Sequence, residues 1–296
     1  MAGNLAGCYQ IWGWHSIMAE IKYVNSANRS MDLSTYPIRM KQKTSGLYAF
    51  EWEVDETDLG NGARVNAFER KSRQYELEID FSGARTGRAQ ILQEFFEVTD
   101  YDVVQKSPGK LYVNEQYIEA YIIASEPQIY DDRYRTVGKI CTLYVPYPFW
   151  MEDKAFSFYP KEEGGSGDFL DFPFNFPYDY TSGQAGTAIL QNTHYVASGF
   201  EMIIYGPCVN PYIAIGGHMY RVYTTVDDQE YIRINSRENT VQRVKNNGEI
   251  VNEFNNRGKD DSVFEPVPPG SQTVVWPGTF GFDIVLHQER SELKWN

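Results

Sequence analysis

The stretch that decides the fold class is YELEIDFSGARTGRAQILQEFFEV, residues 75–98. Apolar side chains alternate with polar ones over Tyr75–Phe81, which is the period of a strand with one buried face. After Gly83 the spacing of the apolar residues becomes helical, so they form a single stripe. The sequence therefore predicts a strand followed by a helix over residues 87–98, with Thr86 as a candidate N-cap.

Further strands are predicted on both sides of this stretch. Lys110–Val113 and Tyr117–Ala124 flank a short polar turn, which is typical of a hairpin. Thr136–Phe149 reads as a long strand that ends in an aromatic and proline cluster. Upstream, Tyr48–Val54 alternates loosely enough for a strand, and Asp58–Gly62 (DLGNG) is a loop signal. We expect these elements to form one domain.

A domain boundary is expected over residues 151–184. Residues 162–168 (EEGGSGD) have the composition of a flexible loop. Residues 171–180 (DFPFNFPYDY) contain too much proline for a central strand. We therefore predict an N-terminal domain over residues 1–150, a linker over residues 151–184, and a second domain over residues 185–296.

The second domain is predicted to consist only of strands and turns. Gly216–Gly217 and Asn247–Gly248 are tight-turn signals between alternating segments. Short strands at this spacing, without a helical period, indicate a β-sandwich or jelly roll. The predicted strands are Gly199–Tyr205, Tyr212–Ile215, Met219–Val226, Glu230–Asn235, Thr240–Lys245, Glu249–Phe254, Ser271–Trp276 and Thr279–His287.

Composition excludes several classes of protein. The net charge of −13 argues against direct binding of nucleic acid, because an acidic chain gains little from the release of counterions from phosphates. The three cysteines are widely spaced, which encodes neither a zinc site nor a disulfide framework. No signal peptide and no apolar run long enough to span a bilayer is visible. We expect a soluble protein made in a reducing cytosol, and the 15% aromatic content favours strands and large contacts.

No catalytic, metal or cofactor signature emerges from the sequence. The histidines lack partners at ligand spacing, and the GNG at residues 60–62 lacks the strand and third glycine of a dinucleotide fingerprint. Serine-hydrolase elbows and phosphate-binding loops are also absent. A polysaccharide hydrolase stays open only because two carboxylates suffice for it, and pairs such as Glu51/Glu53 or Asp227/Asp228 occur by chance in so acidic a chain. We predict no enzymatic activity and no cofactor.

Aromatic residues of the second domain offer an alternative function. Rings on a sandwich can stack on sugars, although strand aromatics more often fill a core. A carbohydrate-binding protein, acting as an accessory or receptor-binding component through this domain, is therefore an alternative function. The candidates for glycan stacking are Tyr212, Tyr220, Tyr223 and Trp276.

Over roughly residues 66–296 the order of elements and several short stretches resemble the distal tail protein family of tailed phages and related prophage tail components. Residues 1–65 differ from the family's usual N-terminus. The stretches that carry the resemblance are Gly199-Phe200-Glu201, Ile204-Tyr205-Gly206-Pro207, Pro211–Ile215, Glu230–Ser236 with Thr240-Val241, Pro269-Gly270, Val274-Val275-Trp276 and Leu293-Lys294-Trp295.

The resemblance implies an N-terminal β-sandwich with a helix and a C-terminal galectin-like sandwich. It further implies a hexameric ring in the virion tail tip, assembled in the host cytoplasm. The implied partners are further copies of the chain, the tail-tube protein, the tail-tip hub and a receptor-binding protein. Ring subunits need large contact faces rich in aromatic residues. The candidates for those contacts are Trp12, Trp14, Trp52, Phe149 and Trp150.

Overall fold

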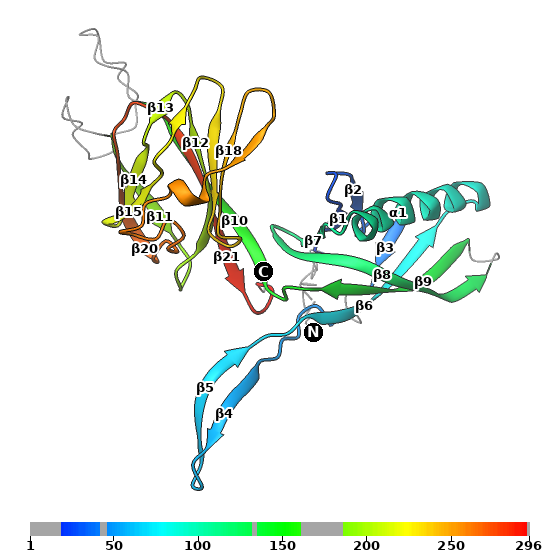
Figure 1. Ribbon diagram of the computed structural model, residues 1–296. Helices are drawn as coiled ribbons and strands as arrows, with labels where there is room; N and C mark the ends of the chain where they lie inside the picture. The colour runs from blue at the N-terminus through cyan, green and yellow to red at the C-terminus, as the bar shows by residue number, and fades with distance from the viewer. Residues whose placement is uncertain (1–18, 42–45, 132–134, 161–185, 295–296) are drawn as a thin grey trace, which may run out of the picture. The chain divides into compact units, whose positions relative to one another are not determined.

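A computed structural model of the protein describes residues 19–41, 46–131, 135–160 and 186–294. The chain divides into two compact units (Figure 1). Unit 1 comprises residues 1–150 and 291–296, and unit 2 comprises residues 151–290. The return of the last residues to unit 1 was not expected from the sequence, which assigned them to the second domain.

The described part of unit 1 is an antiparallel β structure with one α-helix. Its main strands follow the order β2-β1-β7-β8-β9-β6-β3. The long strand β8 pairs with β7 through residues 116–120 and with β9 through residues 121–131, so one strand serves both layers. The elements are β1 (Ile21–Val24), β2 (Ser30–Asp32), β3 (Ile38–Met40), β4 (Glu53–Asp58), β5 (Ala63–Glu69), β6 (Arg73–Ser82), α1 (Arg85–Gln105), β7 (Gly109–Val113), β8 (Gln116–Asp131) and β9 (Thr136–Val145).

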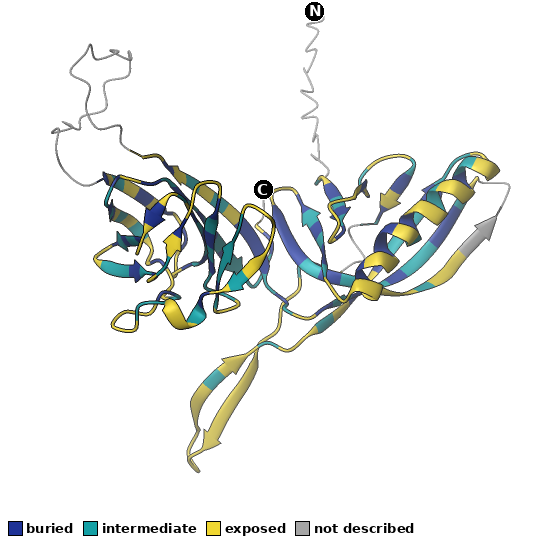
Figure 2. Cartoon of the chain, turned by 45° about the horizontal axis from the view of Figure 1, so that its top comes forward, coloured by how far each residue is buried: buried dark blue, intermediate teal, exposed yellow. Residues whose placement is uncertain are grey.

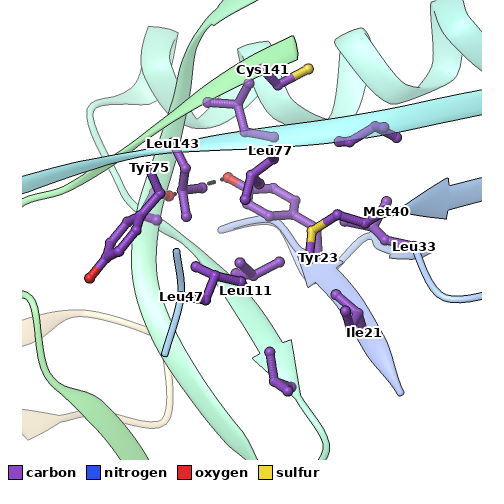
Figure 3. Close-up of a cluster of buried hydrophobic side chains, with 14 of the residues drawn as sticks. Ile21, Tyr23, Leu33, Met40, Leu47, Tyr75, Leu77, Leu111, Cys141 and Leu143 are labelled. Atoms are coloured by element: carbon purple, nitrogen blue, oxygen red, sulfur yellow. Dashed lines mark hydrogen bonds between the residues drawn. The ribbon is translucent and has the colours of Figure 1, made fainter. Parts of the chain in front are cut away.

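The predicted strand at residues 75–81 is confirmed as part of β6. Its alternate side chains are buried, as the pattern indicated, and they enter the core of unit 1. Figure 3 shows Leu77 of β6 among Leu143 of β9, Leu111 of β7 and Tyr23 of β1. The alternation of apolar and polar residues therefore determines which face of the sheet is buried.

The predicted helix is confirmed, but it is longer and begins earlier than the sequence indicated. Ala84 occupies the N-cap position and makes no side-chain capping bond, so Thr86 is not the cap. At the other end α1 continues past Val98 to Gln105, where Lys106 adopts a left-handed conformation. The extra turns show no apolar stripe because the residues they bury, Thr99 and Asp102, are polar and are held by hydrogen bonds.

The predicted hairpin of β7 and β8 is confirmed, with Asn114 at positive φ in its turn. The long strand predicted over residues 136–149 ends earlier, at Val145. A separate strand, β10 (Trp150–Phe158), follows. Residues 151–158, which the sequence placed in a linker, are therefore part of unit 2.

Unit 2 contains two antiparallel sheets and a small two-stranded pair, with no α-helix among its described residues. One sheet contains β19-β18-β17-β12-β21-β10, and the other has the order β11-β20-β14-β15. The remaining elements of the chain are β11 (Gly186–Asn192), β12 (Gly199–Tyr205), β13 (Cys208–Val209), β14 (Tyr212–Ile215), β15 (His218–Arg221), β16 (Thr225–Val226), β17 (Tyr231–Asn235), β18 (Thr240–Val244), β19 (Ile250–Asn252), the 3-10 helix η3 (Phe254–Asn256), β20 (Gly270–Trp276) and β21 (Phe282–Arg290).

Side chains from both sheets of unit 2 meet in one core. Phe200 and Ile234 come from one sheet, while Ile213 and Val274 come from the other. Figure 2 shows buried and exposed residues alternating along these strands. The fold class predicted from the sequence is therefore confirmed: the chain is mostly β, with one helix in its first half and an all-β, galectin-like sandwich in its second.

The turns of unit 2 follow the sequence signals closely. Gly216 and Gly217 both have positive φ in the turn between β14 and β15. That conformation suits a two-residue hairpin whose twist matches its strands. The expected return strand over residues 219–226 is interrupted after Arg221, because residues 225–226 pair separately with β13.

Candidate functional surfaces

The residues expected at a ring contact occupy different environments. Trp12 and Trp14 lie outside the described residues. Trp52 is 39% exposed and Phe149 is partly buried, whereas Trp150 is only 1% exposed and belongs to the core of unit 1. Trp150 therefore stabilises the core of unit 1, and its ring is not available at a surface.

Trp52 and Phe149 are brought together by an arginine. Their rings lie 5.9 Å apart in an edge-to-face arrangement. The guanidinium of Arg70 lies 5.6 Å from the ring of Trp52 and 4.7 Å from that of Phe149. Its Nη1 also donates to the carbonyl of Ser291 at 3.3 Å, and partial burial lowers the pKa of Arg70. This cation–π cluster links Trp52, which directly precedes β4, to Arg70, which directly follows β5.

Between Trp52 and Arg70 the chain forms a two-stranded ribbon of β4 and β5. The ribbon consists of residues 53–69, and its two strands pair with each other and with no other described strand. Figure 2 shows it exposed along almost its whole length. Val54 and Phe68 are direct cross-strand partners, and they are 47% and 60% exposed. An apolar pair is thus presented to solvent.

The ribbon is also acidic. Residues 53–69 contain five acidic side chains and one basic one, Arg64. Glu53 forms an ion pair with Lys71 just beyond the ribbon. Repulsion among the remaining carboxylates discourages indiscriminate pairing of the open strand edges. The ribbon therefore combines an exposed apolar pair with a high density of negative charge.

An open groove of about 430 Å³ lies between α1 and β8 of unit 1. Phe96 and Ile123 supply apolar surface, while Glu97 and Asp100 supply carboxylates. The two acids make the groove a poor receptor for an acidic ribbon from a second copy, because like charges repel at close range.

The four predicted glycan-stacking residues are divided between core and surface. Tyr220 and Trp276 are 1% and 4% exposed, and each donates a hydrogen bond to a backbone carbonyl, those of Glu265 and Phe280 respectively. Neither can present its ring to a sugar, so they are structural residues. Tyr212 is half-buried and Tyr223 is exposed, and both stay at the surface.

Tyr212 and Tyr223 flank a residue that sequence reasoning missed. The guanidinium of Arg221 lies 5.1 Å from the ring of Tyr212 and 5.9 Å from that of Tyr223. The signal was present in the sequence. A two-residue turn at Gly216–Gly217 sets the hairpin register, and that register places Tyr212 opposite Arg221.

Ionisable groups elsewhere serve the fold. Arg243 is paired with Glu230 and Glu253, at 3.1 and 3.0 Å. His218 contacts the carbonyl of Ser262, and His287 contacts Asp153. Among the described residues, no group of three or more histidines, cysteines or carboxylates is placed to hold a metal ion. No helix in the described part of the chain is long and apolar enough to cross a membrane.

Comparison with known proteins establishes the fold through structure rather than sequence. No sequence family and no curated protein matches the chain. The Dit protein of phage SPP1, described as a paradigm of the hub adsorption apparatus in phages that infect Gram-positive bacteria, is 9% identical, with a TM-score of 0.53 over 91% of this chain and 99% of that one.

Two structures of the phage P2 baseplate in its activated conformation, with Ca and with Sr, are also similar. They are 12% and 13% identical to the chain, with TM-scores of 0.60 and 0.61. Each likeness covers 93% of this chain and 99% of the other. The chain therefore has the fold of a phage Dit and baseplate subunit over nearly its whole length.

Proposed function

We propose that this protein is a structural distal tail protein of a phage or phage-like injection particle. In this proposal it forms a hexameric ring in the virion that joins the tail tube to the tail-tip hub or baseplate, and it carries out no catalysis. The observation that carries the proposal is the extent of the structural likeness. The likeness covers 91–93% of this chain, and so takes in both units, and it covers 99% of each phage chain.

The ribbon supports self-assembly on physical grounds. A closed ring needs two different contact faces on each subunit. An isolated two-stranded ribbon is marginally stable in water, and this one exposes Val54 and Phe68 on its surface. Burying that pair against a neighbouring subunit would remove apolar surface from water and would order the strands. We therefore assign the ribbon to one of the two ring contacts.

The cluster at the base of the ribbon supports the same assignment. Arg70 contacts both Trp52 and Phe149, so the base of the ribbon is attached to Phe149 in the rest of unit 1. Orienting a contact segment before binding lowers the entropy lost on association. Trp52 and Phe149 thus position the ribbon in this proposal, while Val54 and Phe68 make the contact.

The test is assembly of the full chain, alone at high concentration and co-expressed with its tail-tube and hub partners. Native mass spectrometry and negative-stain microscopy should show a six-subunit ring. Val54→Asp combined with Phe68→Asp should abolish it, because each substitution places a charge in the proposed contact. Ile250→Asp is the matched control, since Ile250 is an equally exposed apolar residue on a strand of unit 2.

A strictly monomeric protein under both conditions would overturn the proposal of a ring. Rings that persist in the double variant would overturn the role of the ribbon alone. Cell-wall zymography of the same preparation tests the absence of catalysis, and a cleared zone would contradict it.

A further inference from the structure

The outward face of the β11-β20-β14-β15 sheet in unit 2 has an unusual charge distribution. Strand register places Thr187 beside Val275 and Tyr212 beside Arg221. Alternate residues on the opposite face fill the core. In a chain with a net charge of −13, the outward positions of these four strands carry one charged side chain, Arg221. They are Thr187, Ile189, Gln191, Ser271, Thr273, Val275, Tyr212, Ala214, Met219 and Arg221.

The guanidinium of Arg221 contacts two tyrosine rings and forms no ion pair with a described carboxylate. Tyr212 is its cross-strand partner, and Tyr223 is two residues further along the same face. Its guanidinium makes no hydrogen bond or ion pair with any described residue, and its Nε is buried without a partner. Arg243 of the same unit, by contrast, is neutralised by two glutamates.

The arginine and the tyrosine beside it both reach the surface. Arg221 is partly exposed and Tyr223 is 48% exposed, so both side chains are accessible to a ligand.

We propose that Tyr212, Arg221 and Tyr223 form a binding site for an anionic glycan, a chain of sugar rings that carry carboxylate or phosphate groups. The tyrosine rings provide flat surfaces on which sugar rings can stack. The guanidinium can bind a carboxylate or a phosphate through two parallel hydrogen bonds. The uncharged face around it avoids the repulsion that the acidic remainder of the chain would impose on a polyanion.

The inference goes beyond the proposed role in a tail ring, because the site lies within unit 2 and does not require assembly. If the ring also forms, several copies of one weak site would act together on a repetitive polymer, which raises avidity without any new contact. Failure of either idea can therefore be recognised separately, by measuring oligomeric state and glycan binding on the same preparation.

The experiment uses the full chain and three immobilised oligosaccharides of matched length: a uronate oligomer, a sugar-phosphate oligomer and neutral dextran. Binding is followed by biolayer interferometry at several salt concentrations. At least one anionic oligomer should bind, more weakly as salt rises, and the neutral one should bind much less. The two anionic arms distinguish a carboxylate ligand from a phosphate ligand.

Three variants and one control identify the site. Arg221→Gln should weaken anionic binding by about tenfold or more, since it removes a charge-assisted hydrogen-bond pair. Arg221→Lys should lose less, because it keeps the charge but not the paired geometry. Tyr223→Ala should weaken binding by roughly fivefold through lost stacking. Tyr195→Ala, which removes an exposed tyrosine from the β11–β12 loop, should leave binding unchanged.

Thermal melts of each variant show that the fold is retained. Absence of binding to both anionic oligomers would overturn the proposal. Equal binding of dextran would do the same, as would wild-type affinity in both Arg221→Gln and Tyr223→Ala.

Discussion

Two antiparallel hairpins of this chain have very different surroundings. The ribbon of β4 and β5 has an almost fully exposed surface, and its apolar pair, Val54 and Phe68, faces solvent. The hairpin of β17 and β18 buries Ile232, Ile234 and Val241 in the core of unit 2. One hairpin is thus supported by its own subunit, and the other is not.

The difference shows that backbone pairing alone does not determine the stability or the role of a hairpin. Net stabilisation by a hydrogen bond is only about 0.5–1.5 kcal/mol because water competes for the same groups. The β17–β18 hairpin gains most of its stability from buried apolar area, and the ribbon gains little. A segment that keeps strand geometry and an exposed apolar pair without such support is suited to binding another chain.

The largest expected effect is a loss of stability in the β17–β18 hairpin, with no change in the ribbon. Ile234→Ala removes a fully buried side chain, which should lower the free energy of unfolding of unit 2 by about 2–5 kcal/mol. Val54→Ala in the ribbon should change the stability of the isolated subunit by less than about 0.5 kcal/mol. Denaturant unfolding followed by hydrogen exchange, which resolves the two units, measures both.

Val54→Ala should instead weaken ring assembly, which separates the two roles. A loss of subunit stability in Val54→Ala comparable to that in Ile234→Ala would contradict the comparison. It would mean that the ribbon packs against its own subunit.

An intermediate effect is expected at the polar centre of unit 1. Asp102 of α1 is buried, and its Oδ2 accepts a hydrogen bond from Tyr23 at 2.6 Å. Its Oδ1 accepts from the backbone N–H and the hydroxyl of Ser26. Burial, together with the contact to Asp102, raises the pKa of Tyr23, so the hydroxyl remains a donor. Tyr23→Phe should destabilise unit 1 by about 1–3 kcal/mol by leaving a buried carboxylate oxygen unpaired.

Denaturant unfolding of Tyr23→Phe measures this cost. Tyr144→Phe on β9 is the matched control, because the Tyr144 hydroxyl makes no hydrogen bond to a described residue and its loss should be nearly neutral. Amides of the ribbon should exchange at the same rate in both variants, since the ribbon does not draw on this network. Slower or faster exchange there would show coupling between the ribbon and the core.

The sequence predicts those parts of the fold in which one face is buried. Strand β6 follows from strict alternation, and the glycine turn predicts the β14–β15 hairpin because only positive φ closes it. The end of α1 could not be predicted, because Asp102 is buried by polar contacts that residues far away in the sequence supply.

The candidate surfaces were harder to predict, because aromatic residues serve core and surface alike. Tryptophan content alone did not separate Trp150, which is in the core, from Trp52, which is partly exposed. Strand register would have helped: alternation puts Tyr220 on the same face as the buried Val222 and puts Arg221 on the opposite face. A pattern of residue types identifies a sheet, but register decides which rings reach solvent.

The smallest expected effect is a pH dependence of stability in the sheet that contains the β17–β18 hairpin. Tyr205 of β12 lies opposite Tyr231 of β17 and donates a hydrogen bond to Asp283 at 2.7 Å. That bond, with partial burial and the charge of Asp283, raises the pKa of Tyr205 to about 12. A folded-state pKa above the unfolded value means that the contribution to stability is fully present below about pH 10. It is then lost as the pH rises through about 12.

Tyrosinate absorbance during an alkaline titration should show a group that titrates near pH 12 and that is lost in Tyr205→Phe. Asp283→Asn should move that group back towards the ordinary tyrosine pKa, because the acceptor loses its charge. The ribbon contains no tyrosine between residues 53 and 69, so its hydrogen exchange should show no matching alkaline step. Unfolding of the ribbon in parallel with Tyr205 ionisation would mean that the two hairpins are not independent, and the contrast between them would fail.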